Sequence, residues 1–177
     1  MKGKFTTRML TEAGMMMALS IILGRITIYT LPNGGSITAG SMIPLMVFAM
    51  RWGTGAGIAV GGLYGILDFI LKPYFYHPLQ FVLDYPMAFG LLGLAGLGNL
   101  RDNSSYGKAA IGVTLGILGR MLSHTLSGVI FFAEYAGDQN PWIYSIVYNG
   151  SYLVPELVIS LLVLIILWKP LNKALAR

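Results

Sequence analysis

The chain has 177 residues, of which 55% are hydrophobic and only 11% are charged, whereas soluble domains average about 25% charged residues. A soluble protein of this size cannot hide so much apolar surface, so we expect lipid to be its solvent; the absence of cysteine and the two histidines exclude thiolate sites and a convincing metal site. The net charge of +5 does not indicate a nucleic-acid partner, because the basic residues lie in short connectors between apolar runs.

Six apolar runs predict an all-α membrane protein with six transmembrane helices, forming a single domain over residues 1–177. Five of the runs have the length of about 20 residues that a spanning helix needs. The second is short enough to be re-entrant, although the charge distribution favours a crossing. The runs are Met9–Ile28, Ile37–Met50, Gly53–Leu71, Leu79–Leu97, Ala109–Phe132 and Ile143–Trp168.

The distribution of basic residues predicts the orientation. With the N-terminus inside and six crossings, 9 of the 12 basic residues fall on the inner side, as the positive-inside rule requires. We therefore expect both termini in the cytoplasm. The inner residues are Lys2, Lys4, Arg8, Arg51, Arg101, Lys108, Lys169, Lys173 and Arg177.

The first run and the connector after it each carry a local signal. Gly14 and Ala18 form a small-xxx-small step, which lets another helix approach closely. Such a step packs helices within one protein, or forms a docking surface for a partner if it faces outward. The outer connector Leu31–Ser36 is rich in turn-forming residues and can lie over a site as a lid.

Three polar residues from three predicted helices lie at one depth. At 1.5 Å per residue, Asp84 lies about 9 Å below the outer boundary, Asn149 about 10 Å and His124 about 12 Å. Polar residues at membrane depth are functional candidates. Each has a structural alternative: Asp84 could pair with Arg25 or Arg120, His124 could bond a backbone carbonyl, and Asn149 could join two helices. Their common depth favours one site.

Aromatic residues surround this level. Tyr85 and Tyr144 lie below the boundary beside Asp84 and Asn149. Ring faces attract positive charge, and a carboxylate is a strong counter-ion where water is excluded. The combination favours a flat cationic ligand.

Other ionisable residues are assigned differently. Arg120 and Glu156 lie deeper, about 18 and 21 Å below the boundary, and we expect a buried structural ion pair between them. Asp68 and Arg25 lie about three residues from an outer helix end, where long side chains reach water easily. Neither receives a role.

Enzyme activity is not expected. The sequence has no G-x-x-x-x-G-K-[ST] motif, so the chain does not hydrolyse nucleotides by itself. An intramembrane hydrolase using Ser127 and His124 is one alternative, but Leu126–Gly128 does not match the G-x-S-G of such enzymes. A stand-alone secondary transporter of an organic cation, with Asp84 or Glu156 carrying a proton, is the other.

Several motifs resemble one family, the thiamine-specific substrate-binding (S) component of energy-coupling factor transporters. The resemblance runs over nearly the whole chain, and its most specific parts are Leu-Asp-Tyr-Pro and Tyr-Asn-Gly. The segments that carry it are Pro32–Ser36, Gly40–Pro44, His77–Pro86, Gly119–His124 and Trp142–Gly150.

The resemblance implies a multi-pass protein of the bacterial cell membrane that binds thiamine with high affinity under the first outer loop, without a cofactor. Its implied partners are membrane lipid, a transmembrane coupling protein that docks on small residues of the first helix, here Gly14 and Ala18, and two cytoplasmic ATPases. The thiazolium cation would face Asp84, and the aminopyrimidine would face His124, Tyr144 and Asn149.

The family's ligand-binding positions carry over residue by residue. The sequence departs from the family at two places. Phe132 stands where relatives can carry tryptophan and retains ring stacking, whereas the first outer loop lacks the lid tryptophan of some relatives, and a lower affinity is expected for that reason. The binding residues implied are Tyr74, Asp84, Tyr85, His124, Gly128, Phe132, Tyr144 and Asn149.

Overall fold

The computed structural model describes residues 6–32, 34–98 and 105–175. Arg101, predicted on the inner side, lies outside them, as do Lys2, Lys4, Asn33 and Arg177. The elements are α1 (Thr7–Arg25), β1 (Thr27–Thr30), β2 (Ser36–Thr38), α2 (Ile43–Trp52), α3 (Thr54–Leu71), α4 (Pro78–Val82), η1 (Leu83–Met87), α5 (Ala88–Leu91), η2 (Leu92–Gly98), α6 (Tyr106–Phe131), η3 (Ala133–Ala136) and α7 (Pro141–Leu175).

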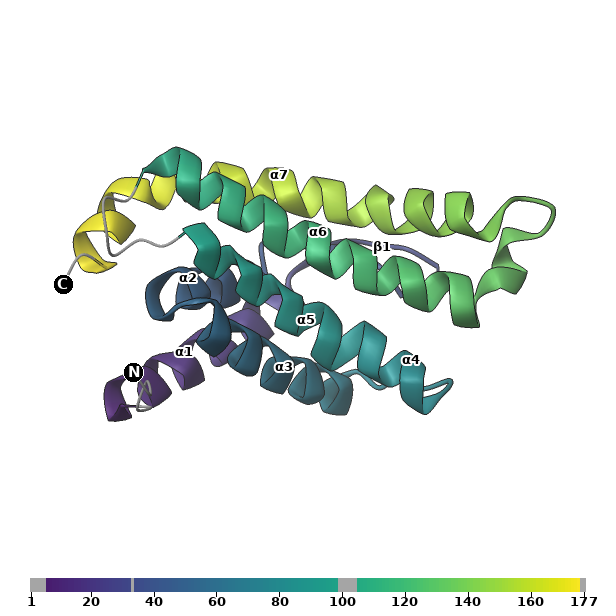
Figure 1. Cartoon of the computed structure of the whole chain (residues 1–177), viewed down its shortest axis with the longest axis horizontal. Helices are drawn as coiled ribbons and strands as arrows, with labels where there is room; N and C mark the ends of the chain where they lie inside the picture. The colour runs from purple at the N-terminus through teal and green to yellow at the C-terminus, as the bar shows by residue number, and fades with distance from the viewer. Residues whose placement is uncertain (1–5, 33, 99–104, 176–177) are drawn as a thin grey trace.

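The helical segments form a bundle, with α4, η1, α5 and η2 following one another as a single rod. The described residues therefore contain six helical segments, one for each predicted run, and α2 is the short one. Four are long and apolar enough to span a membrane: Thr54–Leu71, Pro78–Gly98, Tyr106–Phe131 and Pro141–Trp168. The start of α1 and the end of α7 lie at the same end of the molecule (Figure 1), as the charge distribution predicts for two cytoplasmic termini.

The second apolar run is shorter as a helix than the sequence predicts. Helix α2 has 10 residues, about 15 Å, which is half the hydrocarbon thickness of a bilayer. Its residues from Pro44 to Met50 are all buried, because α1, α3, η2 and α6 surround it. At Gly53, whose φ of 94° suits glycine, the chain turns directly into α3.

The segment between α1 and α2 is a β-hairpin that the sequence analysis did not predict. Thr27 pairs with Thr38 and Thr30 with Ser36 in antiparallel register. The end of the first apolar run and the start of the second were predicted to be helical, and this prediction is wrong. Both are rich in β-branched threonine and isoleucine, which favour strands, and the turn-forming residues between them close the hairpin.

The rod that carries Asp84 is distorted at the site. Residues Leu83–Met87 form a π-helical turn with Pro86 inside it. Proline has no N–H to donate and its ring crowds the preceding turn, which opens the helix at this point. Ser123 of α6 donates a hydrogen bond to the Leu83 carbonyl (2.6 Å). Short π-helical turns of this kind are frequent at functional sites.

Glycines on one face of α3 set the distance between α3 and this rod. A Cβ at Gly61 would collide with the Phe89 carbonyl oxygen, and a Cβ at Gly65 with the Tyr85 carbonyl oxygen. The two backbones are therefore in direct contact, the close packing that small residues allow between membrane helices.

This contact predicts the outcome of adding one methyl group. Gly61→Ala should lower the free energy of unfolding by about 1–3 kcal/mol, because the rigid backbone has to move away. Gly55→Ala on the same helix is the matched control, since a Cβ there meets nothing within 4 Å. Thermal unfolding in detergent should separate the two variants, and equal stability would contradict the packing described.

Candidate functional site

A cavity of about 500 Å³ opens near the outer ends of the helices. The β1–β2 hairpin, α3, α4, η1, α6 and α7 all contribute to its wall. The predicted lid lies against it through Gly34, Gly35 and Ser36. All eight residues named from the sequence as binding residues line this one cavity: Tyr74, Asp84, Tyr85, His124, Gly128, Phe132, Tyr144 and Asn149.

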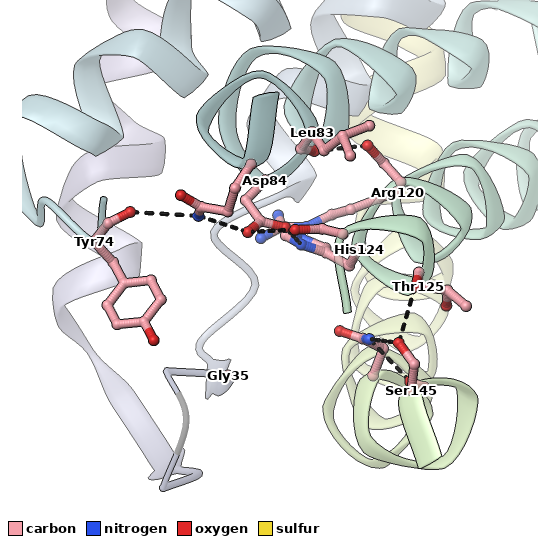
Figure 2. Close-up of polar contacts among 12 residues, drawn as sticks. Gly35, Tyr74, Leu83, Asp84, Arg120, His124, Thr125 and Ser145 are labelled. Atoms are coloured by element: carbon pink, nitrogen blue, oxygen red, sulfur yellow. Dashed lines mark hydrogen bonds and ion pairs between the residues drawn. The ribbon is translucent and has the colours of Figure 1, made fainter. Parts of the chain in front are cut away.

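Asp84 is at the centre of the polar contacts in this wall. Its Oδ2 accepts hydrogen bonds from Gln80 Nε2 (2.7 Å) and Ser127 Oγ (2.9 Å), and its Oδ1 lies 3.0 Å from His124 Nδ1. Figure 2 shows Asp84 and His124 facing each other between the η1 turn and α6. The predicted alternatives, a pair with Arg25 or Arg120, are not formed.

Ser127 donates to Asp84 and has no hydrogen bond to His124 among the described residues. Its hydroxyl is therefore not activated by the imidazole, as a serine nucleophile would need to be. The arrangement does not favour the hydrolase alternative.

The predicted ion pair between Arg120 and Glu156 is wrong. Arg120 Nε donates to His124 Nε2 (3.2 Å), and its guanidinium carbon lies 4.0 Å from the centre of the Phe89 ring. Glu156 instead accepts from Thr38, as described next. Helical depth placed both residues at one level but gave no information on which way each side chain turns.

Glu156 joins α7 to the hairpin. Its Oε1 accepts hydrogen bonds from the Thr38 backbone N–H (2.5 Å) and the Thr38 hydroxyl (2.7 Å). The side chain is 2% exposed, and Oε2 has no hydrogen-bond partner among the described residues. A second contact, from the Gly35 N–H to the Tyr148 hydroxyl (3.2 Å), holds the tip of the hairpin on the same helix.

Asn149 belongs to a hydrogen-bonded cluster at the contact between α6 and α7. Its Nδ2 donates to the Ser145 carbonyl (2.9 Å), and its Oδ1 accepts from the Tyr152 hydroxyl (2.8 Å). Ser145 Oγ donates to the Thr125 carbonyl of α6 (3.0 Å), a contact visible in Figure 2. The amide is thus oriented before any ligand arrives. Among the described residues its own hydrogen bonds all stay within α7, so the helix-joining contact is made by Ser145 and not by Asn149, as the alternative interpretation had it.

Aromatic rings surround the outer part of the cavity. Phe132 lies 5.9 Å from Tyr74 and 6.1 Å from Tyr135, centre to centre, and Tyr144 stacks on Tyr148 at 6.1 Å. Burial against its neighbours raises the pKa of Tyr74, with the nearby Tyr135 and Asp84 adding to the effect. The phenol therefore keeps its proton at neutral pH.

Tyr85 fastens the outer loop to the rod that carries Asp84. Its hydroxyl donates to the Lys72 carbonyl (3.2 Å) and accepts from the Tyr74 N–H (3.0 Å). Tyr85 thereby places the Tyr74 ring at the cavity.

Several wall residues were not named from the sequence as site residues. Gln80 lies one helical turn before Asp84, and Ser127 lies one turn after His124, so helical spacing was the signal that could have found them. Asp68 was assigned no role but lines the cavity. The wall residues missed include Asp68, Gln80, Ser127, Ser145, Tyr152 and Thr38.

Gly128 explains how closely α7 approaches α6 at the site. A Cβ there would collide with Ser145 Oγ. Gly128→Ala should therefore push α7 outward and lower the free energy of unfolding by about 1–3 kcal/mol. The double variant with Ser145→Gly should recover most of this loss, and an unrecovered double variant in thermal unfolding would mean that Gly128 acts elsewhere.

Comparisons with known proteins agree with this geometry. The family model described as thiamine transporter protein (Thia_YuaJ) matches residues 10–176. The thiamine transporter ThiT of Bacillus subtilis (strain 168) is 34% identical over 172 residues, covering 90% of this chain and 89% of the relative. ThiT of Lacticaseibacillus paracasei is 34% identical over 137 residues, covering 69% of this chain and 68% of the relative.

A solved structure of ThiT from Listeria monocytogenes superposes with a TM-score of 0.82 at 28% identity, covering 94% of this chain and 96% of that one. The same fold thus extends over nearly the whole of both chains. Because the family model also spans almost the entire sequence, this chain belongs to the thiamine transporter protein family.

Proposed function

We propose that this multi-pass protein of the bacterial cell membrane binds thiamine in the cavity beneath the β1–β2 hairpin and delivers it for uptake. The observation that carries the proposal is Asp84, a carboxylate in the cavity wall whose hydrogen-bond partners are amide, hydroxyl and imidazole groups. Among the described residues no lysine or arginine forms an ion pair with it, and thiamine carries a thiazolium cation.

The charge of the whole wall supports a monocationic ligand. Counted at formal charge, three carboxylates and two basic side chains in the wall sum to −1. A single positive charge on the ligand balances it in a site where charges interact strongly. The charged wall residues are Asp68, Lys72, Asp84, Arg120 and Glu156.

The aromatic rings of the cavity and the Asn149 amide can bind the remaining parts of thiamine. Phe132 and the tyrosines around it offer faces to the flat thiazolium and pyrimidine rings. Tyr144 and Asn149 offer hydrogen-bonding groups to the aminopyrimidine. These contacts need only the protein's own side chains, so we propose that binding requires no cofactor.

The binding proposal predicts a specific loss when one charge is removed. Isothermal titration calorimetry should show one thiamine per chain, and Asp84→Asn should weaken binding about 30-fold or more, because a buried counter-ion is lost at constant shape. Glu134→Gln, which removes an exposed acid outside the cavity wall, should bind like the unchanged protein. Binding of riboflavin or biotin without thiamine would refute the ligand assignment.

For transport, we propose that the chain is the substrate-binding component of an energy-coupling factor transporter, with a transmembrane coupling protein and two cytoplasmic ATPases as partners. The sequence has no nucleotide-binding motif of its own. The outward face of α1 supports a docking role, because a Cβ at Gly14 would meet nothing within 4 Å. The exposed apolar side chains on this helix are Leu10, Met15, Leu19 and Ile22.

Polar contacts at the inner end hold α1 in place for docking. Glu12 Oε2 accepts from Arg51 Nε (3.0 Å) and Trp52 Nε1 (2.8 Å), at the end of α2. Arg8 donates to the other Glu12 oxygen (3.1 Å). These contacts fix the turn before Gly14 and Ala18, so the small residues are presented on a rigid helix.

The docking proposal separates binding from uptake. Gly14→Trp should abolish ATP-dependent uptake in a reconstituted complex while thiamine affinity stays unchanged, since the new ring points into open space. Leu118→Trp, at an exposed position on α6, is the control and should transport normally. Proton-driven uptake by proteoliposomes that contain this chain alone would instead support the secondary-transporter alternative.

A further inference from the structure

Arg120 is an unusual residue at this depth of the bundle. Among the described residues it has no carboxylate within 4.0 Å. Its contacts are the His124 ring nitrogen and the Phe89 ring. An arginine inside a membrane protein is costly and marks a functional position, and the structural ion pair expected for it is not formed.

The contact with Arg120 determines which nitrogen of His124 carries the proton. A guanidinium has only donors and does not lose its proton in proteins. His124 Nε2, 3.2 Å from Arg120 Nε, must therefore be the acceptor. The proton of a neutral imidazole then lies on Nδ1, where it donates to Asp84 Oδ1 at 3.0 Å. Figure 2 shows Asp84, His124 and Arg120 gathered at one place beside α6.

Both other protonation states of His124 conflict with these contacts. A proton on Nε2 alone would oppose the Arg120 N–H and leave the Nδ1 lone pair facing the Asp84 carboxylate. A doubly protonated ring would also oppose the Arg120 N–H, and it would form an ion pair with Asp84 that neutralises the charge the ligand needs.

We propose that Arg120 is a positioning residue of the thiamine site, which holds His124 neutral with its proton on Nδ1 and so preserves the negative charge of Asp84 for a cationic ligand. This inference rests on the proposed function. The remaining ionisable side chains on the cavity wall near the site have no hydrogen bond to His124 among the described residues; they include Asp68, Lys72, Tyr74, Tyr85, Tyr152 and Glu156.

Nitrogen NMR tests the tautomer directly. The chain has two histidines, and His77→Asn removes the other one while keeping a residue that can cap α4, since His77 accepts from the Leu79 N–H. With ¹⁵N-labelled histidine, His124 should give the Nδ1–H pattern from pH 8 to pH 6. The Nε2–H pattern or a doubly protonated ring at pH 6 would overturn the proposal.

Thiamine affinity tests the consequence for binding. An ordinary imidazole changes its charge between pH 8 and pH 6. In Arg120→Met we expect thiamine affinity to be about tenfold or more weaker at pH 6 than at pH 8, because His124 then gains a proton and neutralises Asp84. The unchanged protein and Arg25→Met, which removes an exposed positive charge outside the cavity wall, should show no such dependence.

The NMR and affinity measurements distinguish a failure of the tautomer proposal from a failure of the proposed function. If Arg120→Met loses the same affinity at both pH values and His124 keeps its Nδ1–H pattern, Arg120 is only a packing residue. If the unchanged protein binds no thiamine, the proposed function fails, whereas the NMR spectrum still reports the tautomer. If Arg120→Met does not fold, the spectrum of the His77→Asn protein alone decides the tautomer.

Discussion

A carboxylate at membrane depth has to be surrounded by hydrogen-bond donors, because an isolated charge there is very costly. Asp84 meets this requirement with three partners from two elements: Gln80 from its own rod, and Ser127 and His124 from α6. The amide and the hydroxyl, together with a neutral imidazole as proposed above, stabilise the charge without cancelling it. The site can therefore be stable when empty and still attract a cation.

The surrounding architecture keeps these partners in place. The π-helical turn at Leu83–Met87 changes the direction in which Asp84 leaves its helix, and Ser123 holds that turn against α6. On the other side, Gly128 lets α7 approach until Ser145 bonds the α6 backbone. Close packing of this kind is the usual substitute for the hydrophobic effect between helices in lipid, and here it also fixes the width of the cavity.

The hairpin between α1 and α2 connects the cavity wall to both α1 and α7. It follows directly from the helix whose outer face carries Gly14 and Ala18, and Glu156 and Tyr148 fasten it to α7. Strand β1 begins at Thr27, two residues after Arg25 ends α1. Glu156 Oε2 has no hydrogen-bond partner among the described residues, so a second donor at this junction would be stabilising.

The amino-acid sequence was enough to predict the class of the molecule and the residues at the centre of the cavity wall, but not the whole wall. Long apolar runs admit only helices in lipid, basic residues report orientation, and helical rise places Asp84, His124 and Asn149 at one depth, so their meeting at one cavity could be predicted. The hairpin, the short α2 and the partners of Arg120 and Glu156 could not. Apolar runs do not distinguish β-branched strands from helices, and depth along a helix does not give the direction of a side chain. The folded structure shows which groups lie within hydrogen-bond distance of each other. That is how Arg120 is seen to bond His124 and Glu156 to hold the hairpin.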